Sequence, residues 1–112
     1  MSDASDASQI EIPPTFVAVF VAPGKLRPSA PYALIAARYE LCEDLAQTLV
    51  PTATQLQLMR DLHASVVLAQ CLEALAGPSA VVERAEARWV VCRLAELLDW
   101  EQPVFQAEDA AL

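Results

Sequence analysis

The stretch Val66-Val-Leu-Ala-Gln-Cys-Leu-Glu-Ala-Leu-Ala76 decides the fold of this chain. It is apolar almost all round, which suits a helix that is covered on more than one side. We therefore expect it to form the central helix of a helical fold, or part of a dimer interface. It ends at Gly77-Pro78, the usual stop signal. Upstream, Thr52-Ala-Thr-Gln55 is a capping-box pattern, so we expect this helix to begin at Thr52.

A second helix is expected before it, from about Pro31 to Val50, where Pro51 ends it. On a helical wheel its apolar side chains share one arc and its acidic ones lie opposite. The arc comprises Leu34, Ile35, Tyr39, Cys42, Leu45, Ala46 and Leu49.

A third helix is expected from Ser79, a good N-cap, to about Trp100, with Pro103 beyond it. Its apolar residues recur at spacings of three and four, which predicts a buried stripe. The stripe comprises Ala87, Val90, Val91, Leu94, Leu97 and Leu98.

The apolar segment before these helices, residues 10–24, is ambiguous. Its β-branched and aromatic residues favour a strand, whereas Pro14 is well placed to open a short helix. A lone strand would leave its backbone unpaired unless a second copy of the chain paired with it. The predicted fold is therefore all-α: a compact three-helix core with an N-terminal apolar arm, either a short helix or a strand paired across a dimer. A Pro-rich loop with Lys25 and Arg27 follows the arm.

Length and composition bound the organisation of the chain. Its 112 residues, 55% hydrophobic and 20% charged, suit one folded domain. We expect that domain over residues 10–100, a disordered acidic N-terminus over 1–9 and an acidic C-terminal tail over 101–112.

Charge and cysteine content restrict the partners and the compartment. The net charge is −8 and no cluster of Lys and Arg is present, so binding to nucleic acid or to an anionic membrane is not expected. The longest early apolar run, residues 16–22, is too short for a membrane helix. The first nine residues do not resemble a secretory signal. Three widely spaced cysteines suit neither a disulfide framework nor a zinc ribbon, which predicts reduced thiols in the cytoplasm.

No residue pattern indicates a cofactor or a metal. With two glycines the chain cannot form a dinucleotide fingerprint, and Gly24-Lys25 is followed by Leu26 instead of the Ser or Thr of a phosphate-binding loop. His63 is the one histidine and cannot supply the usual zinc ligands, so a solvated or capped histidine is expected in preference to a ligand or a base.

Arg38 and Glu73 both lie on otherwise apolar helix faces. A charge in such a place must be paired or must reach solvent. We expect a buried Arg38–Glu73 ion pair that sets the register of the two helices. The functional alternative is that Arg38 receives a carboxylate or phosphate from a ligand.

Trp89, Arg93, Glu96 and Trp100 form a second stripe, on the flank of the third helix away from its aliphatic residues. Trp and Arg are enriched in binding hot spots, so Trp89, Arg93 and Trp100 are candidate partner-binding residues. The alternative is that the segment 16–22 of the same chain covers them.

Three stretches, Ile10-Glu-Ile-Pro-Pro14, Arg38-Tyr-Glu-Leu-Cys-Glu-Asp44 and Trp89-Val-Val-Cys-Arg-Leu-Ala-Glu-Leu-Leu98, resemble a group of short proteobacterial proteins of unassigned function. Some proteins of that group carry the label of chaperone-associated ATPase, but this chain has no recognisable nucleotide-binding motif. The resemblance implies a bacterial cytoplasmic protein.

The function expected from these features is a non-enzymatic protein-protein interaction module: a small adaptor, regulator or chaperone-like protein that forms a homodimer. The alternative is a small-ligand-binding or enzymatic domain that uses Arg38 and Glu73 at a cleft, with His63 nearby.

Overall fold

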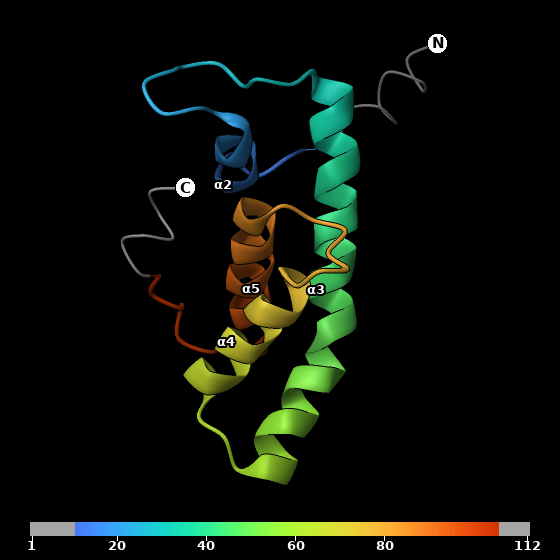
Figure 1. Ribbon diagram of the computed structural model, residues 1–112, viewed down its shortest axis with the longest axis vertical. Coiled ribbons are helices and arrows are strands. Elements are labelled where there is room, and N and C mark those ends of the chain that lie inside the picture. Colours follow the sequence, from blue (N-terminus) through green and yellow to red (C-terminus); the bar gives the residue numbers. More distant parts are fainter. Residues whose placement is uncertain (1–10, 106–112) are drawn as a thin grey trace. The chain divides into compact units, whose positions relative to one another are not determined.

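The computed structural model describes residues 11–105 of the chain. Every regular element within those residues is a helix, which confirms the predicted all-α fold (Figure 1). The chain divides into two units, one up to Leu41 and one from Cys42. The predictions for residues 1–9 and 106–112 lie outside the described part.

The apolar arm is helical. It consists of the short helix α2 (Pro14–Val17) and the 3-10 turn η1 (Ala18–Phe20). Pro14 occupies the first turn of α2, where its missing N–H costs no helical hydrogen bond. Phe16 is fully buried, and its ring centroid lies 5.6 Å from the centroids of both Phe20 and Tyr39. Aromatic packing therefore holds the arm against the first turns of the following helix within the first unit.

The loop between the arm and that helix is tied to η1 at its base and closed by a tight turn. The Ser29 amide donates to the Phe20 carbonyl at 2.7 Å, and the Lys25 amide donates to the Ala22 carbonyl at 3.0 Å. Gly24 has a φ of +80°, which a type II turn requires at its third residue. These bonds give the loop a defined backbone conformation.

Helix α3 (Tyr32–Arg60) runs through Pro51 without a break (Figure 1). The predicted start after Pro31 is confirmed, but the prediction that Pro51 ends the helix is wrong. Proline removes one amide donor from the helix, a local cost. The continuation of the helix past Pro51 buries Ala53 completely. The Thr54 hydroxyl also donates a hydrogen bond to the Val50 carbonyl at 2.9 Å. Thr52 therefore lies inside a helix and opens none.

The break that sequence patterns placed at Pro51 lies ten residues further on. Asp61 adopts a left-handed conformation with φ 51°, and the Leu62 amide donates to the Gln57 carbonyl at 3.3 Å. This geometry ends α3. His63 then caps α4 (Ala64–Leu75), since its Nδ1 accepts the Ser65 amide at 3.1 Å.

Helix α5 (Arg84–Leu98) begins five residues after Ser79, the predicted N-cap. The reason is a capping box between two glutamates: the Glu83 amide donates to Glu86 Oε1 at 2.8 Å, and the Glu83 side chain caps the first turn in return. At the other end Asp99 has a φ of 59°, and the Trp100 amide donates to the Ala95 carbonyl at 2.8 Å.

The core of the second unit forms where α4 and α5 pack side by side (Figure 1). Helix α3 contributes small buried side chains, Cys42, Ala46 and Ala53. The residues that α4 and α5 bury are Val67, Leu68, Cys71, Leu72, Glu86, Ala87, Val90, Val91, Leu94 and Ala95. The stripe predicted for the third helix is thus confirmed from Ala87 to Leu94, while Leu97 and Leu98 are half-buried.

Helix α4 buries one face only. The opposite face exposes Val66, Ala69, Gln70, Glu73 and Ala74. The prediction that this segment is a central helix covered on several sides is therefore wrong, because one side of α4 faces solvent. Its other predicted role, as part of a dimer interface, stays a prediction.

Candidate protein-interaction surface

Arg93, one of the predicted partner-binding residues, joins α5 to α3. Its Nε donates to Glu43 Oε1 at 2.9 Å and its Nη2 donates to Glu43 Oε2 at 3.1 Å. A third bond runs from Nη1 to Glu96 Oε1 at 3.1 Å. This is the bidentate geometry in which a guanidinium binds a carboxylate most strongly.

The charges of this cluster stabilise one another. Hydrogen bonding from Arg93 lowers the pKa of Glu43 below its ordinary value, against the opposing effect of burial, and Gln47 adds a further hydrogen bond. The same interaction with Glu43 raises the pKa of Arg93. Sequence reasoning placed Glu43 on the solvent side of its helix, whereas only 23% of its side chain is exposed.

The two indoles of the predicted stripe, Trp89 and Trp100, are both half-buried. The stripe is therefore neither a fully buried second core face nor a free surface. Its role in partner binding stays a prediction.

Arg38 and Glu73 occupy different environments. Arg38 is half-buried on α3. The Glu73 side chain is 73% exposed, and its Oε2 lies 3.6 Å from Nη2 of Arg84. The prediction that Glu73 is a buried ion-pair partner is wrong, because the face of α4 that carries it points to solvent.

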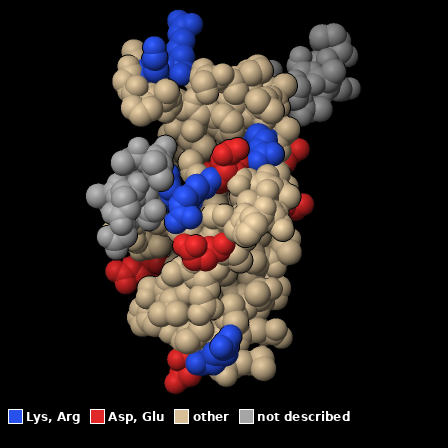
Figure 2. Space-filling view, in the orientation of Figure 1, with Lys and Arg blue, Asp and Glu red and all other residues tan. Residues whose placement is uncertain are grey.

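The most exposed large apolar side chains of the second unit's helices lie at the junction of α3 and α4. Leu58 and Met59, on the last turn of α3, are 74% and 80% exposed, and Val66 on α4 is 41% exposed. We name Leu58 and Met59, which are adjacent in sequence, the corner patch. In Figure 2 uncharged side chains cover most of the lower part of the visible face, where α4 lies in Figure 1, and basic and acidic side chains lie together at its foot, near the end of α3.

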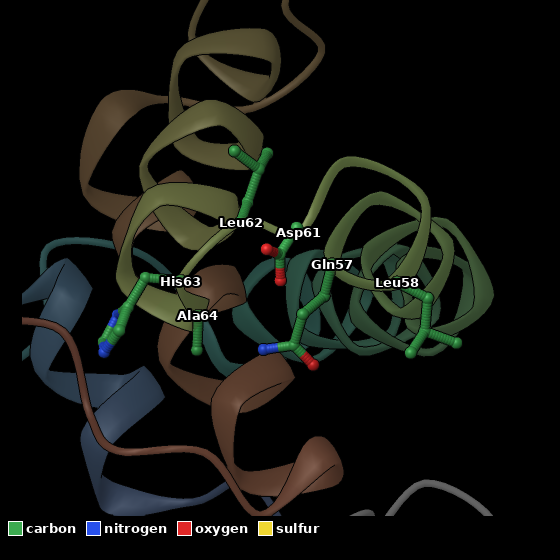
Figure 3. A pocket seen from close by; sticks show the side chains of 6 residues that line it. All are labelled: Gln57, Leu58, Asp61, Leu62, His63 and Ala64. Atoms are coloured by element: carbon green, nitrogen blue, oxygen red, sulfur yellow. The ribbon is translucent and has the colours of Figure 1, made fainter.

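Two hollows adjoin the corner patch. The larger, about 620 Å³ and open to solvent, is lined by Gln57, Leu58, Asp61, Leu62, His63 and Ala64. Figure 3 shows the Asp61 carboxylate in the middle of this lining, between Leu58 on α3 and His63 at the start of α4. The smaller hollow, about 230 Å³, is lined by Thr52, Gln55, Leu56, Met59 and Arg60. Neither lining includes Arg38 or Glu73.

Sequence reasoning missed the corner patch for an identifiable reason. Ending the helix at Pro51 places Leu58 and Met59 in the first turns of a separate helix. The signal that marks them is the left-handed Asp61, and only its backbone conformation reveals the corner.

The remaining reactive side chains serve local structure. His63 Nδ1 accepts the Ser65 amide and lies 2.9 Å from the Ser65 hydroxyl, so His63 caps α4, a role that the sequence did not indicate. The cysteines are free thiols: Cys42 and Cys71 are buried and Cys92 is half-buried. Burial raises the pKa of Cys71 and of Cys92. Among residues 11–105 no three His, Cys, Asp or Glu side chains gather as a metal site would require.

Within the described part of the chain, no helix combines the length and apolar character needed to cross a membrane. Comparison with protein-family models, with curated proteins and with solved structures found no significant match to this chain.

Proposed function

We propose that this chain is a non-enzymatic protein-protein interaction module that forms a homodimer and acts as a small adaptor, regulator or chaperone-like protein. The observation that carries the proposal is the corner patch. Leu58 and Met59 are adjacent in sequence and among the most exposed side chains of their class, at 74% and 80%. Clustered apolar exposure next to a hollow is typical of a surface that another protein covers.

The face of α4 next to the patch supports the same function. It exposes Val66, Ala69 and Ala74 with a single acidic residue, Glu73, among them. A surface with few charges loses little hydration energy when a partner covers it.

The half-buried Trp89 and Trp100 are proposed as a second contact surface for a protein partner. Arg93 supports that surface indirectly, because its bonds to Glu43 and Glu96 hold the part of α5 between the two indoles. In this proposal Arg93 is a positioning residue.

The alternative function, a ligand-binding or enzymatic domain built on Arg38 and Glu73, has less support. It requires both side chains at one cleft, whereas Glu73 is exposed and lies beside Arg84. The free thiols of Cys42, Cys71 and Cys92 favour a reducing compartment, and we propose the cytoplasm.

Sedimentation equilibrium of the full chain at micromolar concentrations tests the proposal. We expect a mass near twice the 12.1 kDa of one chain. The double substitution Leu58→Gln with Met59→Gln should shift the equilibrium to the monomer. Val104→Ser is the control, because Val104 is 93% exposed and lines neither hollow. A mass of one chain at every concentration would contradict the proposed self-association.

A further inference from the structure

The loop before α3 carries an unusual exposed group. Leu26 is 97% exposed, and it stands between the exposed cations Lys25 and Arg27. Neither cation forms an ion pair within residues 11–105. In Figure 2 the basic side chains over this loop have no acidic side chain beside them.

The backbone of this loop is already ordered for binding. The turn bond from the Lys25 amide to Ala22, at 3.0 Å, and the bond from Ser29 to Phe20, at 2.7 Å, close it on either side of Leu26. A loop that keeps its conformation loses less entropy on docking. The loop therefore suits insertion of one apolar side chain with a cation on either side.

The larger hollow at the corner has the complementary character. Leu58 and Leu62 supply apolar walls, and Asp61 is the acidic residue in its lining (Figure 3). Its volume of about 620 Å³ accommodates a leucine side chain and parts of its neighbours. A basic-apolar-basic loop matches a hollow whose mixed lining holds two leucines around a carboxylate, beside the polar Gln57 and His63.

We propose that the Lys25-Leu26-Arg27 loop of one copy docks in the Asp61 hollow of a second copy. Leu26 contacts Leu58 and Leu62, while Lys25 or Arg27 pairs with Asp61. In a two-fold dimer the contact forms twice, because the loop of each copy enters the hollow of the other. The inference rests on the proposed self-association and names the residues that perform it.

The apolar contact should dominate the affinity, because an exposed ion pair contributes little. We expect Leu26→Ser to weaken dimerisation by roughly tenfold or more, the loss expected when a buried leucine contact is removed. Leu58→Glu should have a similar effect. Val104→Glu is the control, because Val104 is 93% exposed and lines neither hollow.

Mixing two defective variants gives the decisive experiment. Leu26→Ser retains an intact hollow and Leu58→Glu retains an intact loop. Each should be monomeric by sedimentation velocity, and an equimolar mixture should form a heterodimer, weaker than the wild-type dimer because one contact replaces two. Circular dichroism of each variant measures its helix content, which should be unchanged because the substituted side chains are exposed.

The possible outcomes separate this inference from the proposed function. If the wild-type chain dimerises but Leu26→Ser or Leu58→Glu dimerises equally well, the loop contact is wrong while self-association stands. If both variants are monomeric and their mixture stays monomeric, the loop and hollow do not meet between copies and the inference is overturned. A monomeric wild-type chain overturns both proposals.

Discussion

Arg93 on α5 and Glu43 on α3 are fifty positions apart in sequence and are joined by two hydrogen bonds of 2.9 and 3.1 Å. The pair connects α5 to the part of α3 that belongs to the second unit. Because a guanidinium and a carboxylate match only in one relative orientation, the bidentate contact restricts how α5 can slide or rotate on this part of α3.

This pair should make stability depend on pH in acid. The pKa of Glu43 lies below its ordinary 4.5, so the charged form is favoured in the folded state. The resulting stabilisation is present above the unfolded-state pKa and is lost as the pH falls through the folded-state pKa. We expect Glu43→Gln to cost about 1 kcal/mol near neutral pH, discounted for partial exposure. Chemical denaturation of both proteins across pH should show the difference vanish in acid. Glu40→Gln, at an exposed site on the same helix, should show no such pattern.

Replacing Pro51 should stabilise the protein, because Pro51 lies inside a continuous helix. Pro51→Ala restores an amide donor for the Gln47 carbonyl, and we expect a gain of about 1–3 kcal/mol in the free energy of unfolding. Denaturant unfolding measures it. Pro28→Ala in the loop is the control and should be neutral or slightly destabilising, since there proline only restricts the unfolded chain. A lower free energy of unfolding for Pro51→Ala would indicate that two separate helices meet at Pro51.

Asp99 is strained by its backbone conformation and placed unfavourably for its charge. Its φ of 59° is in the left-handed region, and it follows the C-terminus of α5, where a helix disfavours negative charge. We expect Asp99→Gly to raise the free energy of unfolding by about 1 kcal/mol. Asp99→Asn removes the charge but keeps a side chain, so its smaller gain separates the two contributions. Thermal unfolding of the three proteins provides the comparison, and an unstable glycine variant would refute this account of the helix end.

The indoles of Trp89 and Trp100 should contribute to both stability and partner binding, because each is half-buried. Alanine at a fully buried tryptophan costs about 3–5 kcal/mol. We expect Trp89→Ala and Trp100→Ala to cost less than that and to weaken capture of a protein partner from the native cell by roughly tenfold or more. Unfolding measured beside affinity capture tests this. A loss of stability as large as that of a fully buried tryptophan, with unchanged capture of the partner, would show that Trp89 and Trp100 serve packing and not binding.

The thiols of Cys71 and Cys92 should react slowly with alkylating reagents. Burial raises the pKa of both, which lowers the fraction of reactive thiolate, and the charge of Glu96 raises the pKa of Cys92 further. Glu96→Gln should therefore speed alkylation of Cys92 by iodoacetamide and leave Cys71 unchanged as an internal control. Mass spectrometry of the modified peptides measures both rates. Equal rates for Cys92 with and without the substitution would exclude the contribution of Glu96.

Part of the candidate site could be predicted from local pattern. Trp89 and Arg93 lie on α5 as helical spacing predicts, whereas Trp100 follows the end of that helix at Leu98, so the predicted spacing does not extend to it. The partners of these residues could not be predicted. Glu43 is distant in sequence, and the helical wheel gives no indication that a carboxylate opposite the apolar arc is reached by an arginine from another helix. For the same reason the sequence pattern predicted an ion pair of Glu73 with Arg38, whereas the Glu73 carboxylate lies beside Arg84.

Local pattern is sufficient to predict three main helices after Pro31 and the buried positions of α5 from Ala87 to Leu94. Apolar spacing, Gly77-Pro78 and Pro31 act over a few residues, and no distant contact is needed to interpret them. The positions at which the helices end depend on tertiary contacts. Whether Pro51 ends a helix depends on what the continued helix buries, and Ala53 is fully buried in the second unit. Whether Asp61 turns the chain depends on a conformation that aspartate adopts only when the surrounding structure compensates its strain. The corner patch follows from those two outcomes, because burial is a property of the folded chain and local pattern does not specify it.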